Sequence, residues 1–235
     1  MVAMNSNVFF RFATVEDFEE VLDFYVKNGC SAGTLMTALN FSEDDRRELL
    51  IAKVRFGLPD GLTILAFDKS TQQLVGCNIF GLWHRNRKHS QQLESPKSER
   101  GRIFHAFSET LRSHFWDLCP RNVDTVARGE NTLVRSDYRR QHIGAQMMQI
   151  QQKKLIEMKI QGAVGVVSSI ANQNNVKNFG AIALAELSYA TLAKAYGIPL
   201  DVVGASKAVL AYSALDGDDS FKPEVVIIDR IECKL

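Results

Sequence analysis

The sequence has few cysteines and no closely spaced pair of them. Among its 235 residues are Cys30, Cys77, Cys119 and Cys233, which lie far apart and form no CxxC pair. Disulfide frameworks and zinc sites use closely spaced cysteines, so the sequence predicts free thiols in a reducing compartment. The first twelve residues also lack the basic and apolar stretches of a secretory leader. We therefore expect a cytoplasmic protein.

An excess of charge of one sign is also missing, as are long apolar runs. There are 28 Lys and Arg against 27 Asp and Glu, a net charge of +1. Nucleic-acid-binding domains show a clear Lys and Arg excess, so we expect no nucleic-acid partner. No apolar run approaches the length of about 18 residues that a membrane span requires. The 46% hydrophobic content suits one globular domain over residues 1–235.

Motifs for several other chemistries are absent. The histidines His84, His89, His105 and His114 show neither HxxxH nor HExxH spacing, so no metal site is predicted. There is no GxSxG nucleophile motif, and neither P-loop nor dinucleotide-binding glycines occur. The basic run 84–89 is interpreted as a solvated loop rather than an anion site.

Strand-like and helix-like segments alternate along the chain, which predicts one α/β domain with a mixed sheet. The run 181–195 fits either a strand or a helix, and the polar run 85–100 reads as an exposed insertion. Strands are expected over 8–12, 62–67, 74–83, 123–134, 163–170 and 224–231, with 62–67 and 74–83 joined as a hairpin, and helices from Phe18 to Gly29, over 42–56 and 103–118, and from about Gln141. The helix from about Gln141 should have one broad apolar face, interrupted by Gln151 and formed by Ile143, Met147, Met148, Ile150, Leu155 and Met158. Residues 85–100 and 193–220 are expected to form substrate loops.

The most informative segment is a strand, a basic turn and a helix start between residues 131 and 148. A helix start offers unpaired N–H groups and the positive end of the helix dipole. Gly144 and Ala145 would let a phosphate approach the backbone, and Arg139 and Arg140 add positive charge. Taken alone, the segment fits either an anion site or a turn with solvated arginines.

The run Arg139-Arg140-Gln141-His142-Ile143-Gly144 resembles the acetyl-CoA signature of the Gcn5-related N-acetyltransferases, Arg/Gln-x-x-Gly-x-Gly/Ala. The order of predicted elements resembles that family over nearly the whole chain. It is most similar to the arylalkylamine N-acetyltransferase-like branch of invertebrates. The resemblance implies a mixed central sheet of about seven strands flanked by helices, with 181–190 as a strand.

The resemblance also implies which residues hold acetyl-CoA. Main-chain atoms of the fourth strand would pair with the pantetheine arm, the following turn would hold the pyrophosphate, and Asn172 or Asn174 would lie near the pantetheine. His142 stands where the family has its first glycine, and it could crowd the pyrophosphate or donate a hydrogen bond to it. The cofactor-binding residues expected on this basis are Leu133, Val134, Arg139, Arg140, Gln141, His142, Ile143, Gly144, Ala145 and Asn172.

Each of these assignments has a plainer alternative. Leu133 and Val134 also suit core packing, which is compatible with a role for their main chain. The Asn-rich stretch 172–175 also suits a helix cap and turn.

A proton acceptor is harder to assign. The arylalkylamine branch places a glutamate just after its first helix, but residues 28–35 contain no carboxylate. We hypothesise that Glu130, on the predicted fourth strand, accepts the proton and that Ser168 assists at the thioester. Unbroken alternation puts Glu130 on one face with Thr132 and Val134, whereas a bulge would reverse its facing. The alternative is an exposed polar residue in a turn.

The resemblance implies an acetyl-CoA-dependent N-acetyltransferase for a small amine, with an arylalkylamine as one candidate. Acetyl-CoA would be the co-substrate, and no metal is expected. The rival reading is a binding protein of the same fold that has lost the chemistry. The sequence identifies neither the amine nor the oligomeric state.

Overall fold

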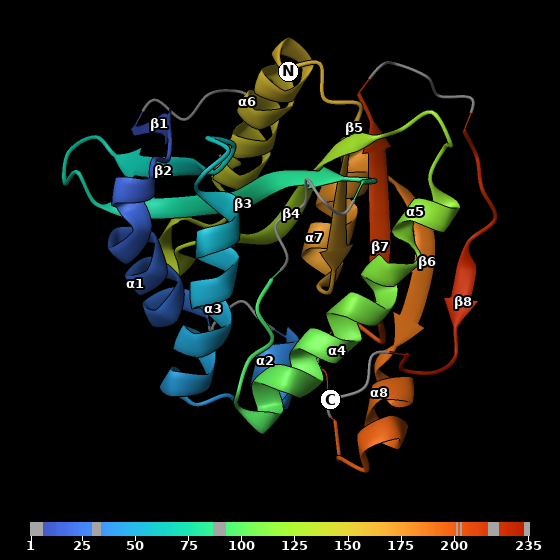
Figure 1. Ribbon diagram of the computed structural model, residues 1–235. Coiled ribbons are helices and arrows are strands. Elements are labelled where there is room, and N and C mark those ends of the chain that lie inside the picture. The colour runs from blue at the N-terminus through green and yellow to red at the C-terminus, as the bar shows by residue number, and fades with distance from the viewer. Residues whose placement is uncertain are drawn as a thin grey trace.

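One mixed sheet runs through the protein (Figure 1), in the strand order β1-β2-β3-β4-β5-β7-β6-β8. The computed structural model describes residues 7–29, 34–86, 93–200, 202, 204–215 and 221–232. The strands are β1 (Val8–Phe12), β2 (Ile64–Asp68), β3 (Leu74–His84), β4 (Thr125–Val134), β5 (Gly162–Val167), β6 (Ile182–Ser188), β7 (Lys207–Ala214) and β8 (Val226–Ile228). The helices are α1 (Phe18–Asn28), α2 (Thr34–Ala38), α3 (Glu43–Gly57), α4 (Glu99–Ser113), α5 (Phe115–Leu118), α6 (Ile143–Glu157), α7 (Ile170–Asn178) and α8 (Tyr189–Tyr196), with 3-10 turns η1 (Val15–Asp17) and η4 (Ser136–Tyr138).

Most predicted elements are confirmed, and local start signals explain several of them. Ser42 begins α3 with a reciprocal capping box: its hydroxyl accepts from the Asp45 N–H at 3.1 Å, and the Asp45 carboxylate accepts from the Ser42 N–H at 2.9 Å. Thr14 and Asp17 form a similar box before α1. The predicted hairpin is the antiparallel pair β2 and β3.

Several elements differ from the prediction. Strand β7 lies in a region predicted to be a substrate loop, yet it pairs antiparallel with both β5 and β6 near the middle of the sheet. It raises the strand number from about seven to eight. The ambiguous run 181–195 contains both a strand and a helix, β6 and α8. Helix α4 begins earlier than predicted because Ser98 caps it, and β8 is shorter than predicted.

Helices cover both faces of the sheet, and the two faces have different partners. Helices α6 and α7 lie on one face, while α1, α3, α4 and α8 lie on the other (Figure 1). On the α6 face, Ile143 and Met147 pack against Ile64 and Val75. Among the described residues, no helix has both the length and the hydropathy to cross a bilayer.

The apolar face predicted for α6 is interrupted by Gln151, and the structure gives that residue a structural role. Its side-chain amide donates to the carbonyl oxygens of Leu62 at 2.8 Å and Asn78 at 3.1 Å, and its oxygen accepts from the Asn78 amide. These bonds satisfy a buried polar group that would otherwise destabilise the interface. Met158, predicted on the same face, is exposed.

Strands β4 and β5 pair over a short stretch and then separate. They are parallel from Val126 to Gly129, opposite 162–165, and their ladder ends there. At the same point β4 carries a bulge: Phe80 of β3 lies opposite Gly129, Ile79 lies opposite Asn131, and Glu130 is left between them. A bulge between Glu130 and Val134 is one of the two predicted alternatives, and the structure has the bulge at Glu130 itself.

Two contacts show what the bulge does. Glu130 faces α3 and α4, whereas Thr132 turns to the α6 face and donates to the Asn78 side chain at 2.6 Å. From α1, the buried Tyr25 hydroxyl reaches the bulge and lies 2.9 Å from the carbonyl oxygen of Asn131. The bulge thus places Glu130 on a face it would not otherwise reach.

The packing of α3 on β3 leads to a first prediction. A Cβ atom at Gly81 would lie 2.8 Å from the Phe56 carbonyl oxygen and 2.6 Å from its ring. Gly81→Ala is therefore expected to lower the free energy of unfolding by about 1–3 kcal/mol in urea denaturation, because helix and strand must separate.

Gly29→Ala is the matched control for that change. Its Cβ would meet no atom within 4 Å, and its φ of −67° suits any residue. Its free energy of unfolding should stay equal or rise by about 0.4–1 kcal/mol. Equal stability of the two variants would contradict the close approach of α3 and β3.

Candidate active site

A cavity of about 180 Å³ opens where β4 and β5 part. Residues from both faces of the sheet line it, so it reaches through the gap between the strands. Such a gap allows two ligands that approach from opposite faces to meet. The α3 and α4 side contributes Lys53, Phe104, Phe107, Ser108 and Arg112, and the α6 and α7 side contributes Met148, Gln152, Asn172, Asn175 and Val176.

Three of the predicted site residues come together in this cavity: Glu130, Ser168 and Asn172. Ser168 follows β5, and its carbonyl oxygen accepts from the Tyr189 hydroxyl at 2.8 Å. The next residue, Ser169, caps α7 by accepting from the Asn172 N–H at 3.3 Å. Residue 172 therefore belongs to a capped helix start, and it also lines the cavity.

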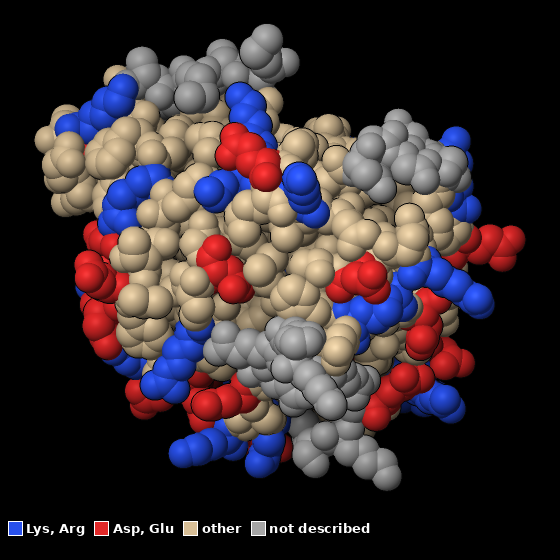
Figure 2. Space-filling view, turned by 45° about the horizontal axis from the view of Figure 1, so that its top comes forward, with Lys and Arg blue, Asp and Glu red and all other residues tan. Residues whose placement is uncertain are grey.

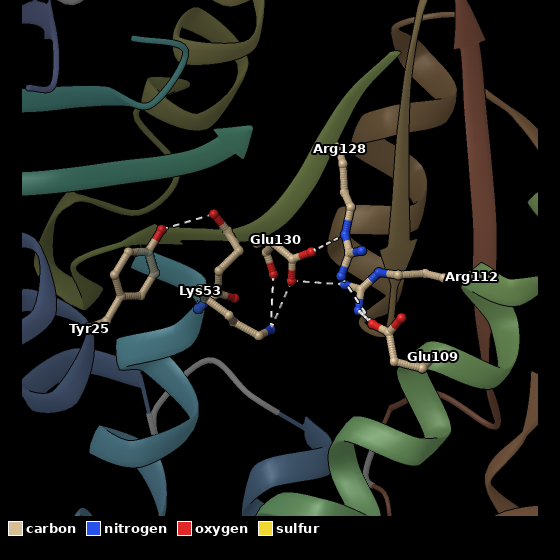
Figure 3. Close-up of polar contacts among 7 residues, drawn as sticks. Tyr25, Lys53, Glu109, Arg112, Arg128 and Glu130 are labelled. Atoms are coloured by element: carbon tan, nitrogen blue, oxygen red, sulfur yellow. Dashed lines mark hydrogen bonds and ion pairs between the residues drawn. The ribbon is translucent and has the colours of Figure 1, made fainter. Parts of the chain in front are cut away.

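A ring of four charged side chains lies at the cavity wall on the α4 side (Figure 3); we call Glu109, Arg112, Arg128 and Glu130 the ion ring, and Arg112 and Glu130 among them line the cavity. Each arginine contacts both glutamates. Arg112 lies 2.6 Å from Glu109 and 3.0 Å from Glu130, and Arg128 lies 3.0 Å from Glu109 and 2.5 Å from Glu130. The ring joins α4 to β4, and the side chain of Glu130 has no exposed surface.

Lys53 of α3 adds a further positive charge beside the ring. Its ammonium group donates to the Glu130 carbonyl oxygen at 3.1 Å and lies 3.8 Å from the Glu130 carboxylate. The Phe104 ring centroid lies 5.1 Å from the same nitrogen. The lysine side chain is almost fully buried.

Burial and neighbouring charges shift two pKa values in this cluster. Burial by itself raises the pKa of Glu130, but the charges of Arg112, Arg128 and Lys53 outweigh it and lower the pKa to about 2. Burial also lowers the pKa of Lys53 to about 8, although Glu130 opposes this shift. Near neutral pH, Glu130 is therefore ionised and Lys53 is mostly protonated.

The burial of Glu130 and its pKa bear on the two roles considered for it, an exposed polar residue in a turn and a proton acceptor. The exposed-turn alternative is wrong, because Glu130 is buried in β4. As a proton acceptor, Glu130 stays a prediction, and its low pKa means that it could pass a proton on but not hold it.

The start of α6 has the geometry of an anion site. The helix begins after His142, which makes no side-chain cap, and both Arg140 and His142 have left-handed backbones with φ of 62° and 59°. A Cβ atom at Gly144 would meet nothing nearer than Val134 at 4.0 Å, so the first turn is open. Unpaired N–H groups at such a start fit a phosphate group.

The remaining predicted cofactor residues surround this start. Ile143 is buried against the sheet, and Ala145 lies in the first turn of α6. Gln141 is exposed, as is Arg139, whose side chain reaches back to the Val134 carbonyl oxygen at 3.4 Å. Their assignment to the pyrophosphate of acetyl-CoA stays a prediction.

Leu133 and Val134 turn their side chains to opposite faces of β4. Leu133 belongs to the core under α1 and α3, and Val134 packs toward α6, as core packing requires. Since the ladder to β5 ends at Gly129, the edge of β4 beyond it has no strand partner among the described residues. Pairing of this edge with a ligand stays a prediction.

Sequence reasoning missed the ion ring and Lys53. The signal was present: Lys53 follows Leu49 and Leu50 on the buried side of α3. A charged residue at a core position of a helix indicates a buried partner.

Some expectations cannot be compared with the structure. Residues 30–33 after α1, together with Cys30, His89 and Cys233, lie outside the described residues. Cys77 and Cys119 are buried free thiols. Within the described ranges, no group of His, Cys, Asp and Glu could hold a metal ion.

No family model matches the sequence, and no curated protein matches it. Several solved structures, however, align with this chain. A protein from the mosquito Aedes aegypti, provisionally assigned as arylalkylamine N-acetyltransferase 7, aligns with a TM-score of 0.75 at 15% identity over 89% of this chain and 88% of that one. Arylalkylamine N-acetyltransferase 2 from Aedes aegypti aligns with a TM-score of 0.70 at 15% identity over 89% and 100% of the chains.

A polyamine N-acetyltransferase from Drosophila melanogaster that forms N-acetylagmatine aligns with a TM-score of 0.63 at 15% identity, covering 87% of this chain and 98% of that one. The chain has the fold of the Gcn5-related N-acetyltransferases. The fold class expected from the sequence is thereby confirmed. His142 stands where the family signature has its first glycine, and the structure allows the effect of this difference on stability to be tested.

His142→Gly is expected to raise the free energy of unfolding by about 1 kcal/mol, measured by urea denaturation. A side chain in the left-handed region is strained, and glycine removes that strain while remaining acceptable at a helix N-cap. Gln141→Gly is the control, because Gln141 is not among the residues with positive φ. A gain of the same size in both variants would contradict strain at His142.

Proposed function

We propose that this protein transfers the acetyl group of acetyl-CoA to the nitrogen of a small amine. The observation that carries the proposal is the cavity through the sheet at the β4 and β5 gap, with an open helix start on one side of it. Gly144 lies one to two helical turns from Met148 and Gln152, which line the cavity, or about 6–12 Å along α6. A thioester in the cavity and a pyrophosphate at the helix start are compatible with that spacing.

Binding at this site would promote direct attack of the amine on the thioester. The amine nitrogen forms a bond to the carbonyl carbon and gives up a proton to Glu130 or to water, the carbon–sulfur bond breaks, and the thiolate takes up a proton. The chain contributes by positioning the two ligands in a buried cavity, which is worth several orders of magnitude in rate. Ser168 lines the thioester end, where its hydroxyl can donate to the developing oxyanion.

The structural neighbours support an amine as the acceptor. Their names specify arylalkylamines in Aedes aegypti and polyamines, including agmatine, in Drosophila melanogaster. The space-filling view (Figure 2) shows acidic and basic side chains interspersed around a largely uncharged centre, with no extended patch of one sign on that face. A small molecule suits this surface better than a highly charged polymer does.

A second candidate function is binding of acetyl-CoA without catalysis. It is favoured by the low pKa of Glu130, because a carboxylate held by two arginines is a poor proton acceptor. The two candidates share the cofactor site and differ in turnover. They are therefore tested in sequence, binding first.

Acetyl-CoA at 100 times its dissociation constant should stabilise the protein by about 2.7 kcal/mol, seen as a rise in Tm. Gly144→Glu should abolish this rise, because it places bulk and negative charge at the pyrophosphate. Gly144→Ala should retain it, since the added Cβ meets open space. If Gly144→Glu behaves as the unmodified protein does, acetyl-CoA binds elsewhere.

Glu130→Gln tests the proton acceptor. If Glu130 takes the amine's proton, kcat near neutral pH should fall by at least about 10²-fold while acetyl-CoA still raises the Tm. Glu109→Gln is the matched control: it removes the same charge from the ion ring, but Glu109 does not line the cavity. Equal losses in both variants would assign Glu130 a structural role only.

A further inference from the structure

The cavity wall on the α3 and α4 side carries an excess of positive charge. Among the described residues that line the cavity, Lys53, Arg112 and Glu130 are charged. Within the ion ring, two arginines balance two glutamates. The ammonium of Lys53 therefore remains as one uncompensated positive charge at the cavity.

Lys53 and Arg112 also have donors that the described residues leave unused. An ammonium group has three N–H donors, and Lys53 makes one hydrogen bond, to the Glu130 carbonyl oxygen. Its distance of 3.8 Å to the Glu130 carboxylate exceeds that of a hydrogen bond. The Arg112 Nε atom is buried without a hydrogen-bond partner in the described part of the chain.

Buried donors of a cation are costly to leave unpaired, so an acceptor in the cavity would be stabilising. Glu130 does not take this part, because its carboxylate is bound by both arginines of the ion ring and lies 3.8 Å from the Lys53 ammonium. Acetyl-CoA is expected on the α6 side, and its thioester end carries no charge. The acceptor amine must therefore supply the negative charge.

We propose that the amine substrate of this enzyme carries a carboxylate, and that Lys53 binds that carboxylate inside the cavity. This inference rests on the proposed acetyl transfer and narrows its substrate to amino acids. A plain arylalkylamine would instead place a second positive charge beside Lys53. A single negative charge matches the single uncompensated ammonium, which favours a carboxylate over a doubly charged phosphate.

The rest of this wall suits such a ligand. Phe104 and Phe107 offer apolar surface for a side chain, and the Ser108 hydroxyl lies on the same wall. The Phe104 ring also faces the Lys53 ammonium and helps to hold it at the cavity. Lys53 would thus determine specificity without taking part in bond making.

The test compares amino acids with their decarboxylated amines: phenylalanine with phenethylamine, leucine with isoamylamine, and 4-aminobutyrate with propylamine. Calorimetric titration into the complex of the protein with CoA should give a dissociation constant at least about 10-fold lower for the acid in one or more pairs. Lys53→Met should abolish that ratio. Lys27→Met, which removes an exposed lysine of α1, should preserve it.

Lys53→Gln provides a second variant if the methionine variant unfolds, because the amide keeps the bond to Glu130 and loses the charge. The inference is overturned if the plain amine binds as well as the acid in every pair. It is also overturned if the ratio survives in the folded Lys53 variant.

Release of CoA thiol with the same pairs separates this inference from the proposed function. Acetylation of plain amines in preference to acids would overturn the carboxylate inference and support acetyl transfer. Lys53-dependent binding of acids without any thiol release would support a carboxylate site and overturn acetyl transfer.

Discussion

The separation of β4 from β5 is the feature on which the rest of the site depends. The two strands share a parallel ladder of four residue pairs, ending at Gly129 opposite Gly165. Beyond that point, β4 keeps β3 as a partner along its whole length. Its other edge has no strand partner in the described part of the chain, so backbone groups that a neighbouring strand would satisfy are available to a ligand. The cavity is the space left by this loss of pairing.

The ion ring keeps the separated region ordered. Arg112 and Glu109 come from α4, and Arg128 and Glu130 come from β4, so four charges connect a helix to the strand at the point where its ladder with β5 ends. Removing one partner of such a buried set costs about 3–5 kcal/mol, because it leaves an uncompensated charge. Replacing the whole set with apolar residues could cost little. The ring therefore favours one arrangement of α4 on β4 more than it adds stability.

Ionisation of Glu130 links the ring to pH. Its pKa of about 2 lies below the ordinary value, so its contribution to the free energy of unfolding is complete above about pH 4.5 and is lost as the pH falls toward 2. Near neutral pH the ring is fully charged. The positive charges that stabilise the ionised form of Glu130 also make it a weak proton acceptor.

The sequence predicted the features that depend on local chemistry. The capping box of Ser42 and Asp45, the hairpin of β2 and β3, and the open turn before Gly144 all follow from neighbouring residues. The family resemblance added the order of the elements, and with it the assignment of 181–190 as a strand. Strand β7 was missed because its apolar run lies within a stretch read as a substrate loop.

The contacts around Glu130 could not be predicted, since they depend on distance in the folded chain. Lys53, Glu109 and Glu130 are far apart in sequence, and although the position of Lys53 on the buried side of its helix indicates a buried partner, it does not identify that partner. The bulge was foreseen only as an alternative, because a strand pattern does not state where its register changes. Tyr25 fixes the bulge from α1, more than 100 residues away in the chain.

The bulge also explains how one strand serves two ligands. Thr132 and Val134 face α6, where the cofactor site is proposed, while Arg128 and Glu130 face α3 and α4, where Lys53 lies. Because side chains alternate along a strand, removing one residue at the bulge would exchange the faces of everything on one side of it. The ion ring would then lose Glu130, and Lys53 would lose the carbonyl oxygen to which it donates. The one residue inserted at the bulge therefore determines that Lys53 and the open start of α6 lie on opposite faces of the same strand.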